Sequence, residues 1–410
     1  MTRRVRLVAC LASLLVSVTA QGQAVRAFTG ATLIDGTDRN PVPNATILVR
    51  GGKVVAAGPA NAVTVPAGAE RVSLAGKTVI PGLINAHGHV NTPADLDTYA
   101  AYGITTVYSL GGEPESVFAA RAAQNTPSLS RARVFVAGPV LTPNTPAEAR
   151  TMVAGVAAQK VDIVKIRVDD NLGTTPKMAP EVYRAVIDEA HKRGLRVATH
   201  LFYLADAKSL MDAGTDLVAH SVRDAEVDAP FIAALRRRNV CVSPTLMREV
   251  STFVYESKPA FFSDSLFLAH ANKEWMATVS QPARMEAMRT SQSAQRYKVA
   301  LDVANRNLKK LSDAGVTIAM GTDTGPMGRF QGYFELMELE MMVQAGLTPR
   351  QALIAATRNA ARCMKIDAEL GTLEPGKWAD FVVLDANPLE NISNVRRISG
   401  VWIAGNRLGN

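Results

Sequence analysis

The chain has 410 residues, of which 47% are apolar and 20% are charged, and this composition excludes an intrinsically disordered protein. The length exceeds one ordinary hydrophobic core, so we expect one large domain and a smaller one. The formal net charge is +8, but no run of five like charges occurs, and the pattern favours a solvated surface over a nucleic-acid interface.

The first residues have the pattern of an export signal. Basic TRRVR is followed by the apolar run LVACLASLLVSVTA, which is too short to span a bilayer, and cleavage is expected after Ala20 or Ala24. We therefore predict a signal peptide over residues 1–24 and a periplasmic or secreted mature protein, with an uncleaved anchor as the alternative. Only Cys241 and Cys363 then remain, too few for a disulfide framework, and we interpret both as core residues.

Short strand-like segments with tight turns occupy both ends of the mature chain. Residues 25–80 contain ATLIDG, ATILVRGGKVVAAG and RVSLAGKTVI, and the pair Gly51-Gly52 is typical of a hairpin turn. Residues 371–410 contain WADFVVLDANP and GVWIAGNRL. We predict that the two ends pair into one small β-sandwich, which is discontinuous in sequence.

Strand-like and helix-like segments alternate over residues 81–370. Such alternation is typical of a parallel sheet covered by helices, and eight strands is the number of a closed barrel. The segments are TVIPGLINAH, GITTVYSL, ARVFVAGPV, VDIVKIRV, LRVATHLF, TDLVAHSV, VCVSPTL and VTIAMGTD. The predicted fold is therefore α/β, a (β/α)8 TIM barrel over residues 81–370 with the small discontinuous β-sandwich beside it.

One connection in this region is unusually long. It lies between VCVSPTL and VTIAMGTD and is rich in aromatic side chains over residues 253–275. Two interpretations of residues 246–300 stay open. The segment is either a helical excursion that packs on the barrel, or a lid that forms the wall of a pocket for a bulky apolar substrate.

Candidate metal ligands stand at the ends of the strand-like segments, where barrels build their active sites. His87 and His89 form a His-x-His pair, and residues i and i+2 of a strand point to the same side. Neutral imidazole is a common ligand for zinc, nickel and iron. The other strand ends carry Lys165, His200, His220 and Asp323.

This arrangement resembles the amidohydrolase superfamily, and within it the imidazolonepropionase-like and prolidase-like metal-dependent hydrolases. The resemblance rests on IPGLINAHGH, on the lysine of DIVKI, on AGTDLVAHSVRD and on GTLEPGKWADFVVLD, and it covers nearly the whole chain after the predicted signal. It implies two divalent metal ions in one site. Zinc is the favoured metal, although manganese, cobalt and iron suit the same ligands.

The resemblance also implies how the ligands divide. Lys165 would be carboxylated on its side-chain nitrogen and bridge the two ions, because an unmodified ammonium has no lone pair to offer a metal. One ion would be held by His87, His89 and Asp323, and the other by His200 and His220. The alternative is a plain lysine, beside a single metal or paired with Asp162, Asp169 or Asp170.

The expected chemistry is hydrolysis of an amide. A hydroxide that bridges the two ions would attack the carbonyl carbon, with Asp323 and His220 as catalytic residues and Asp323 as general base and then acid. We predict an exported hydrolase of carbon–nitrogen bonds that acts on a peptide-like or N-acyl amino-acid substrate, as a dipeptidase, carboxypeptidase or aminoacylase. An ester, lactone or phosphotriester hydrolase is the alternative, and an inactive binding scaffold is less favoured because no ligand is missing.

The expected partners are small. The substrate is a small molecule or short peptide, no nucleic acid or membrane is expected for the mature form, and a homo-oligomer is left open. Tyr203, Arg223 and Arg329 are the expected substrate-binding residues, since either arginine could bind a carboxylate through two hydrogen bonds. A structural ion pair is the alternative for each arginine. Two positions depart from many relatives, which have aspartate in place of Asn85 and tyrosine in place of Phe202.

Overall fold

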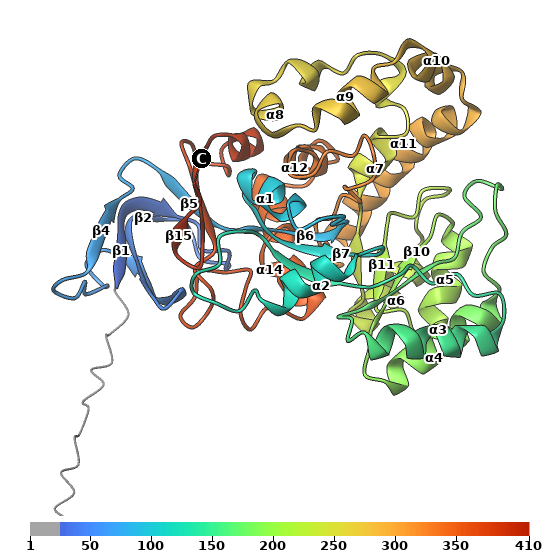
Figure 1. Ribbon diagram of the computed structural model, residues 1–410, viewed down its shortest axis with the longest axis horizontal. Helices are drawn as coiled ribbons and strands as arrows, with labels where there is room; N and C mark the ends of the chain where they lie inside the picture. Colours follow the sequence, from blue (N-terminus) through green and yellow to red (C-terminus); the bar gives the residue numbers. More distant parts are fainter. Residues whose placement is uncertain (1–24, 410) are drawn as a thin grey trace, which may run out of the picture.

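A mixed α/β fold is seen in the computed structural model, which describes residues 25–409 (Figure 1). The predicted signal peptide, residues 1–24, lies outside the described residues. Within residues 25–409, no helix combines the length and the apolar character that a membrane span requires.

Strands from both ends of the chain meet in one eight-stranded sheet, in the order β15-β14-β13-β5-β1-β2-β3 with β4 also paired to β1. The pairing of the two ends is therefore as predicted, whereas the two-layered sandwich stays a prediction. Gly51 and Gly52 both have positive φ and form the two-residue turn between β2 and β3. The strands are β1 (Arg26–Leu33), β2 (Val42–Arg50), β3 (Lys53–Pro59), β4 (Glu70–Ser73), β5 (Thr78–Pro81), β13 (Phe381–Leu384), β14 (Ile398–Ile403) and β15 (Asn406–Arg407).

Seven of the eight predicted barrel segments are parallel strands, arranged in chain order in two sheets. Helices follow most of them, as a βα repeat requires. The strands are β6 (Leu83–Gly88), β7 (Ile104–Ser109), β8 (Arg133–Val136), β9 (Val164–Arg167), β10 (Val197–His200), β11 (Leu217–Ala219) and β12 (Cys241–Ser243). The helices between them are α1 (Asp95–Ala101), α2 (Glu115–Ala122), α3 (Pro146–Ala158), α4 (Pro180–Lys192), α5 (Leu204–Ala213) and α6 (Ala229–Arg238).

Backbone hydrogen bonds join the two parallel sheets on both sides. Leu141 N donates to Lys165 O at 2.8 Å, which links the chain after β8 to β9. On the other side, Val242 N donates to Thr317 O at 3.1 Å and Ala86 N donates to Met320 O at 2.8 Å. Residues 316–320 therefore lie between β12 and β6. This segment forms an isolated bridge and no regular strand. One reason is that Met320 N donates to Ala355 O, in a helix, and not to a residue of β6 or β12.

Gly82 marks the passage from the eight-stranded sheet to the parallel strands. Its nitrogen donates to Asp380 O at 2.8 Å, so the residue is still held by the first sheet. A Cβ at this position would overlap Oγ1 of Thr105 in β7. Only glycine lets the chain pass this close to β7. The next residue, Leu83, is the first residue of β6, and the His-x-His pair lies at the other end of that strand.

The long connection forms several short helices, seen together at the top of Figure 1, and one long helix of 22 residues. Phe261, Phe262 and Phe267 are buried, and Phe267 contacts Phe330 and Tyr333 with ring centroids 4.9 and 5.0 Å apart. Most of the aromatic side chains thus serve packing, the first of the two interpretations. The elements are α7 (Leu246–Val250), η1 (Val254–Glu256), η2 (Ala260–Ser263), α8 (Ser265–His270), α9 (Lys273–Val279), α10 (Pro282–Thr290) and α11 (Gln292–Asp313). The remaining elements are α12 (Tyr333–Gln344), α13 (Pro349–Ala355), α14 (Arg358–Met364) and η3 (Ile392–Arg396).

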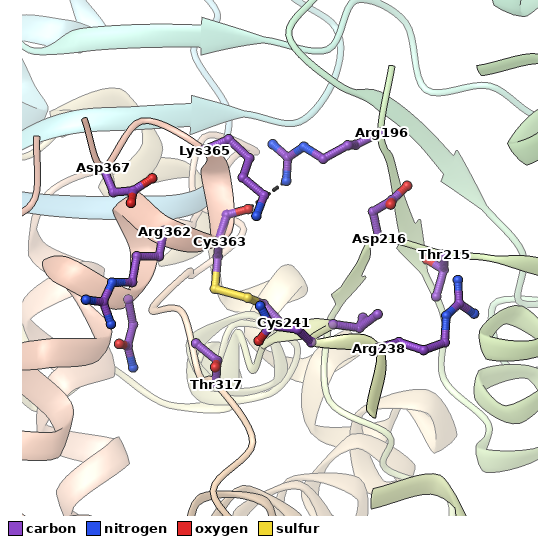
Figure 2. Close-up of a pocket in the computed structure, with 13 residues that line it drawn as sticks. Arg196, Thr215, Asp216, Arg238, Cys241, Thr317, Arg362, Cys363, Lys365 and Asp367 are labelled. Carbon is purple, nitrogen blue, oxygen red and sulfur yellow. Dashed lines mark hydrogen bonds between the residues drawn. A yellow bond between two sulfur atoms is a disulfide. The ribbon is translucent and has the colours of Figure 1, made fainter. Parts of the chain in front are cut away.

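A disulfide joins Cys241, at the amino end of β12, to Cys363 in α14, with the two Cα atoms 5.9 Å apart (Figure 2). The interpretation of the two cysteines as core residues is confirmed, but the bond between them was not predicted. Both are buried, but they are bonded to one another across 122 residues of sequence. Sequence spacing alone does not show such a contact, because the two residues meet only after the parallel strands have been laid side by side.

Candidate metal centre

Three of the six predicted ligands converge closely. The ligand atoms of His87, His220 and Asp323 all lie within 4.8 Å of one another, and all three residues are buried. They come from the end of β6, the end of β11 and the segment that follows residues 316–320. The alternation of buried strands with helices brings these carboxyl ends to one place, although 236 residues separate the first and the last of them in the chain.

His89 joins this group through Asp323. Its Nε2 lies 2.8 Å from Asp323 Oδ1, and its Nδ1 lies 2.9 Å from Gly111 O. A carbonyl oxygen only accepts, so Nδ1 carries the proton and Nε2 is the lone-pair atom of the neutral ring. The lone pair of Nε2 therefore faces a carboxylate oxygen, an arrangement in which a bound cation would be held by both groups.

His200 and His220 form the second pair of imidazoles, with ring centroids 4.2 Å apart. His220 Nδ1 lies 2.7 Å from Thr245 Oγ1, while His200 Nε2 lies 2.8 Å from Asp169 Oδ2. Asp169 was not predicted to hold a ligand histidine. A carboxylate behind a metal-binding histidine fixes the orientation and the tautomer of the ring, so Asp169 has the position of a supporting residue.

Lys165 reaches the same place from β9. Its Nζ is buried and lies 3.2 Å from His87 Nε2. None of the three carboxylates considered as ion-pair partners takes that role, because Asp162 pairs with Arg121, Asp169 with His200, and Asp170 accepts from Tyr203. Burial lowers the pKa of Lys165 to about 7. The side chain therefore has a substantial neutral fraction near neutral pH, and the neutral amine is the form that carboxylation requires.

The chemistry of the donor set fits a metal. Burial lowers the pKa of His87 to about 3 and that of His200 to about 4, so both rings are neutral at neutral pH, the form that binds metals. His220 Nε2 is buried and has no hydrogen-bond partner among the described residues. Buried polar atoms normally have partners, and a cation bound by this ring would give the atom one.

The backbone is strained at two of the predicted ligand positions. His220 has φ 129° and Asp323 has φ 60°, in the left-handed region that side chains with a Cβ rarely adopt. Such conformations cost on the order of 1–3 kcal/mol each and persist where the surroundings impose them. The Asp323 nitrogen donates to His87 O at 2.6 Å, and the His220 nitrogen donates to Ser243 O at 3.0 Å. The fold thus imposes the direction of both side chains.

A buried network supports the strand that carries the His-x-His pair. Asn85 Oδ1 accepts from His87 N at 2.9 Å, and Asn85 Nδ2 donates to Glu335 Oε1 at 2.6 Å. The hydroxyl of Thr322 donates to the same Glu335 oxygen at 2.6 Å, which fixes the chain just before Asp323. Burial raises the pKa of Glu335 to about 7. The amide at position 85 suits this network, because an aspartate would place a second carboxylate against Glu335.

The three predicted substrate-binding residues are engaged within the protein. Tyr203 donates to Asp170 Oδ1 at 2.8 Å, and Arg329 Nη1 donates to Asp323 Oδ2 at 2.6 Å. Arg223 is buried, not exposed at an open mouth, and its Nε lies 3.0 Å from Glu249 Oε1. For both arginines the structure shows the ion-pair alternative, while their contact with a substrate stays a prediction.

A cavity of about 410 Å³ lies at the opposite, amino end of the parallel strands, beside the disulfide (Figure 2). It is lined by basic side chains, but these have structural roles. Arg196 donates to Cys363 O at 2.6 Å and to Met364 O at 3.0 Å, the last carbonyl groups of α14. Arg238 and Arg362 stand in the last turns of α6 and α14, where cations suit the helix dipole. This cavity is separate from the candidate metal centre.

Replacing Asp169 by asparagine is expected to weaken zinc binding by roughly 10- to 100-fold, because the His200 ring loses the carboxylate that orients it. The measurement is zinc affinity, by competition with a chelator of known affinity. Asp170→Asn is the matched control, since it removes the neighbouring carboxylate, which bonds to Tyr203. Equal zinc affinities of the Asp169 variant and the unchanged protein would show that Asp169 does not support the site.

Comparisons with known proteins agree with the geometry. The model of the amidohydrolase family matches residues 78–408. Ochratoxinase from Aspergillus niger is 28% identical over 282 residues, which is 66% of this chain and 51% of that protein, so the chain spans about half the length of this relative. Imidazolonepropionase from Rhodococcus jostii is 23% identical over 385 residues, covering 89% of this chain and 88% of that protein.

Solved structures give the same result for the fold. A Bifidobacterium longum protein provisionally described as a prolidase is 27% identical and superposes with a TM-score of 0.78 over 95% of each chain. A Xaa-Pro dipeptidase with methionine bound in its active site is 20% identical and has a TM-score of 0.76, over 94% of this chain and 100% of that one. The family model covers far more than half of the sequence. The chain therefore belongs to the amidohydrolase family.

Proposed function

We propose that this protein is an exported, metal-dependent amidohydrolase that cleaves an amide bond in a peptide-like or N-acyl amino-acid substrate. The observation that carries the proposal is the convergence of the His87, His220 and Asp323 ligand atoms within 4.8 Å, in a member of the amidohydrolase family. Export is supported by the signal-like N-terminus and by the disulfide, since disulfides persist in oxidising compartments.

We interpret the parallel strands as a closed (β/α)8 barrel, with the eight-stranded sheet as the small discontinuous domain. The hydrogen bonds from β12 to residues 316–320, and from there to β6, support closure. In a barrel of this kind all six predicted ligands stand at the carboxyl end of the strands, where loops form the active site.

The residues fit two divalent ions, with zinc as the favoured metal. Lys165, carboxylated by reaction of its neutral amine with carbon dioxide and loss of a proton, would contact both ions. The position of its Nζ beside His87, away from any carboxylate partner among the described residues, supports this role. When bound, the ions would polarise the substrate carbonyl and lower the pKa of a water molecule. The ligands would be His87, His89 and Asp323 for one ion and His200 and His220 for the other.

Asp323 would move the proton of the reaction. Burial alone would raise the pKa of Asp323, but the Arg329 guanidinium and the rings of His87 and His89 hold it well below its usual range. The carboxylate is therefore ionised at neutral pH and able to accept the proton of the attacking water. It would then pass this proton to the leaving nitrogen, while Arg329, on the other carboxylate oxygen, keeps Asp323 in place.

The test is a substrate screen with purified protein, metal-free and reloaded with zinc. N-acyl amino acids and dipeptides are compared with the matching esters and with lactones. We expect metal-dependent release of the free amino acid from the amides, with little activity in the metal-free form. Hydrolysis of esters and lactones without any amide would favour the alternative chemistry, and activity in the metal-free protein would contradict the proposal.

A further inference from the structure

Two buried arginines share a single carboxylate close to the candidate metal centre. Arg223 Nε lies 3.0 Å from Glu249 Oε1, and Arg248 Nη1 lies 3.1 Å from Glu249 Oε2. All three side chains are buried, at 1% exposure for Arg223, 7% for Arg248 and 0% for Glu249. Arg248 and Glu249 belong to α7, directly after β12, and neither was singled out from the sequence.

This arginine pair is attached to the segments that carry the ligand histidines. Arg223 N donates to Phe202 O at 3.1 Å, and Arg223 Nη1 donates to Leu201 O at 2.8 Å, on the chain that follows His200. Arg248 N donates to Thr245 O at 3.1 Å, and the hydroxyl of the same Thr245 contacts His220 Nδ1. The pair therefore lies at the carboxyl end of β10, β11 and β12, on the same side as the metal centre.

The charges in contact within this pair do not balance. Two guanidinium groups face one carboxylate, and the other side-chain partner of Arg248 is the neutral hydroxyl of Tyr297, at 3.2 Å. Among residues 25–409, Arg248 Nε, Arg223 Nε and Arg223 Nη2 are buried without a hydrogen-bond acceptor, and Glu249 Oε1 is buried without a donor, so the contact between Arg223 and Glu249 is an ion pair that lacks hydrogen-bond geometry. Buried N–H donors without an acceptor are unfavourable, and an anionic group bound beside Arg248 would supply one.

Apolar side chains adjoin the arginine pair. Phe202, Tyr297 and Ala300 form a small buried cluster, with Tyr203, Phe253 and Leu172 at its edge. The Arg223 guanidinium lies over the Phe202 ring at 4.6 Å, and that of Arg248 lies over the Tyr297 ring at 4.5 Å. A ligand that carries both an anionic group and an apolar or aromatic side chain would match the two features together.

We propose that Arg248, supported by Glu249 and Arg223, binds the carboxylate of the substrate. Arg248 is the anchor rather than Arg223, because Arg223 is the more buried and its Nη1 is already bonded to Leu201 O and Ser221 O. The inference rests on the proposed function and narrows it to amides of amino acids that have a free carboxylate and an apolar or aromatic side chain.

The first test compares two substrates that differ only in the carboxylate, N-benzoylphenylalanine and N-benzoyl-2-phenylethylamine. The quantity measured is the ratio of their kcat/KM values in the zinc-loaded protein. Arg248→Met is expected to lower this ratio at least 30-fold. Arg306→Met, which removes an exposed arginine of α11, is the matched control and is expected to keep the ratio. An equal loss on both substrates in the Arg248 variant would overturn the anchor.

The second test needs no variant. Calorimetric titration of the zinc-loaded, unchanged protein with 3-phenylpropionate and with 3-phenylpropionamide compares a carboxylate with its neutral isostere. We expect the carboxylate to bind at least ten times more tightly, and equal affinities would overturn the inference. Failure of the proposed function would look different, because the zinc-loaded protein would then hydrolyse no amide at all.

Discussion

Replacement of Lys165 by alanine is expected to lower kcat at least 10³-fold, about 4 kcal/mol of lost transition-state stabilisation at the usual conversion of 1.36 kcal/mol per tenfold change. The reason is that the variant loses the one side chain proposed to contact both ions, at a buried position beside His87. The measurement is steady-state hydrolysis of an N-acyl amino acid by zinc-loaded protein.

Two comparisons sharpen this experiment. Lys192→Ala, at an exposed lysine of α4, is the matched control and is expected to keep full activity. Acetate or propionate in the buffer is expected to restore part of the activity of the Lys165 variant, because a small carboxylate can occupy the space of the carboxylated side chain. Full activity of the Lys165 variant without any added carboxylate would show that Lys165 does not bridge two metal ions.

Loss of the Cys241–Cys363 disulfide is expected to lower the melting temperature by on the order of 10 °C. A bond that closes a loop of 122 residues restricts the unfolded chain by on the order of 4–5 kcal/mol in the chain-entropy model. The measurement is thermal unfolding of the Cys241→Ala/Cys363→Ala variant beside the unchanged protein. Because the bond lies at the opposite end of the parallel strands from the metal centre, activity at low temperature is expected to change little.

A reductant provides the control for this second experiment. It should lower the melting temperature of the unchanged protein and leave that of the double variant where it is. If the double variant melts at the same temperature as the oxidised, unchanged protein, the disulfide does not contribute to stability as described.

The features that the sequence predicts well are periodic or local. The alternation of strands and helices, and the strand-end positions of His87, His200 and His220, follow from residue patterns over short windows, whereas Lys165 is the second residue of β9 and not its last. The turn at Gly51-Gly52 is local as well. The eighth segment was predicted less well, since residues 316–320 have a strand-like composition but bond to partners that change along the segment.

Contacts between distant parts of the chain were not predictable in the same way. Asp169 is one of the ion-pair partners predicted for Lys165, but it contacts His200 instead. Which of the two it contacts depends on how β9 and β10 align. The pairing of Arg223 with Glu249 brings together the chain after β11 and α7. The sequence does indicate that Glu335 is unusual, because a carboxylate in the apolar stretch YFELMELEMM needs buried hydrogen-bond partners. The sequence does not show that Asn85 is one of these partners.

The two-metal centre is tested most directly by the metal content of the active protein, measured together with its activity. Metal-free protein is titrated with zinc, and bound metal and hydrolysis of an N-acyl amino acid are followed in the same samples. We predict that activity appears with bound zinc and is complete at two ions per chain. Full activity at less than one ion per chain would contradict a centre built from His87, His89, Lys165, His200, His220 and Asp323.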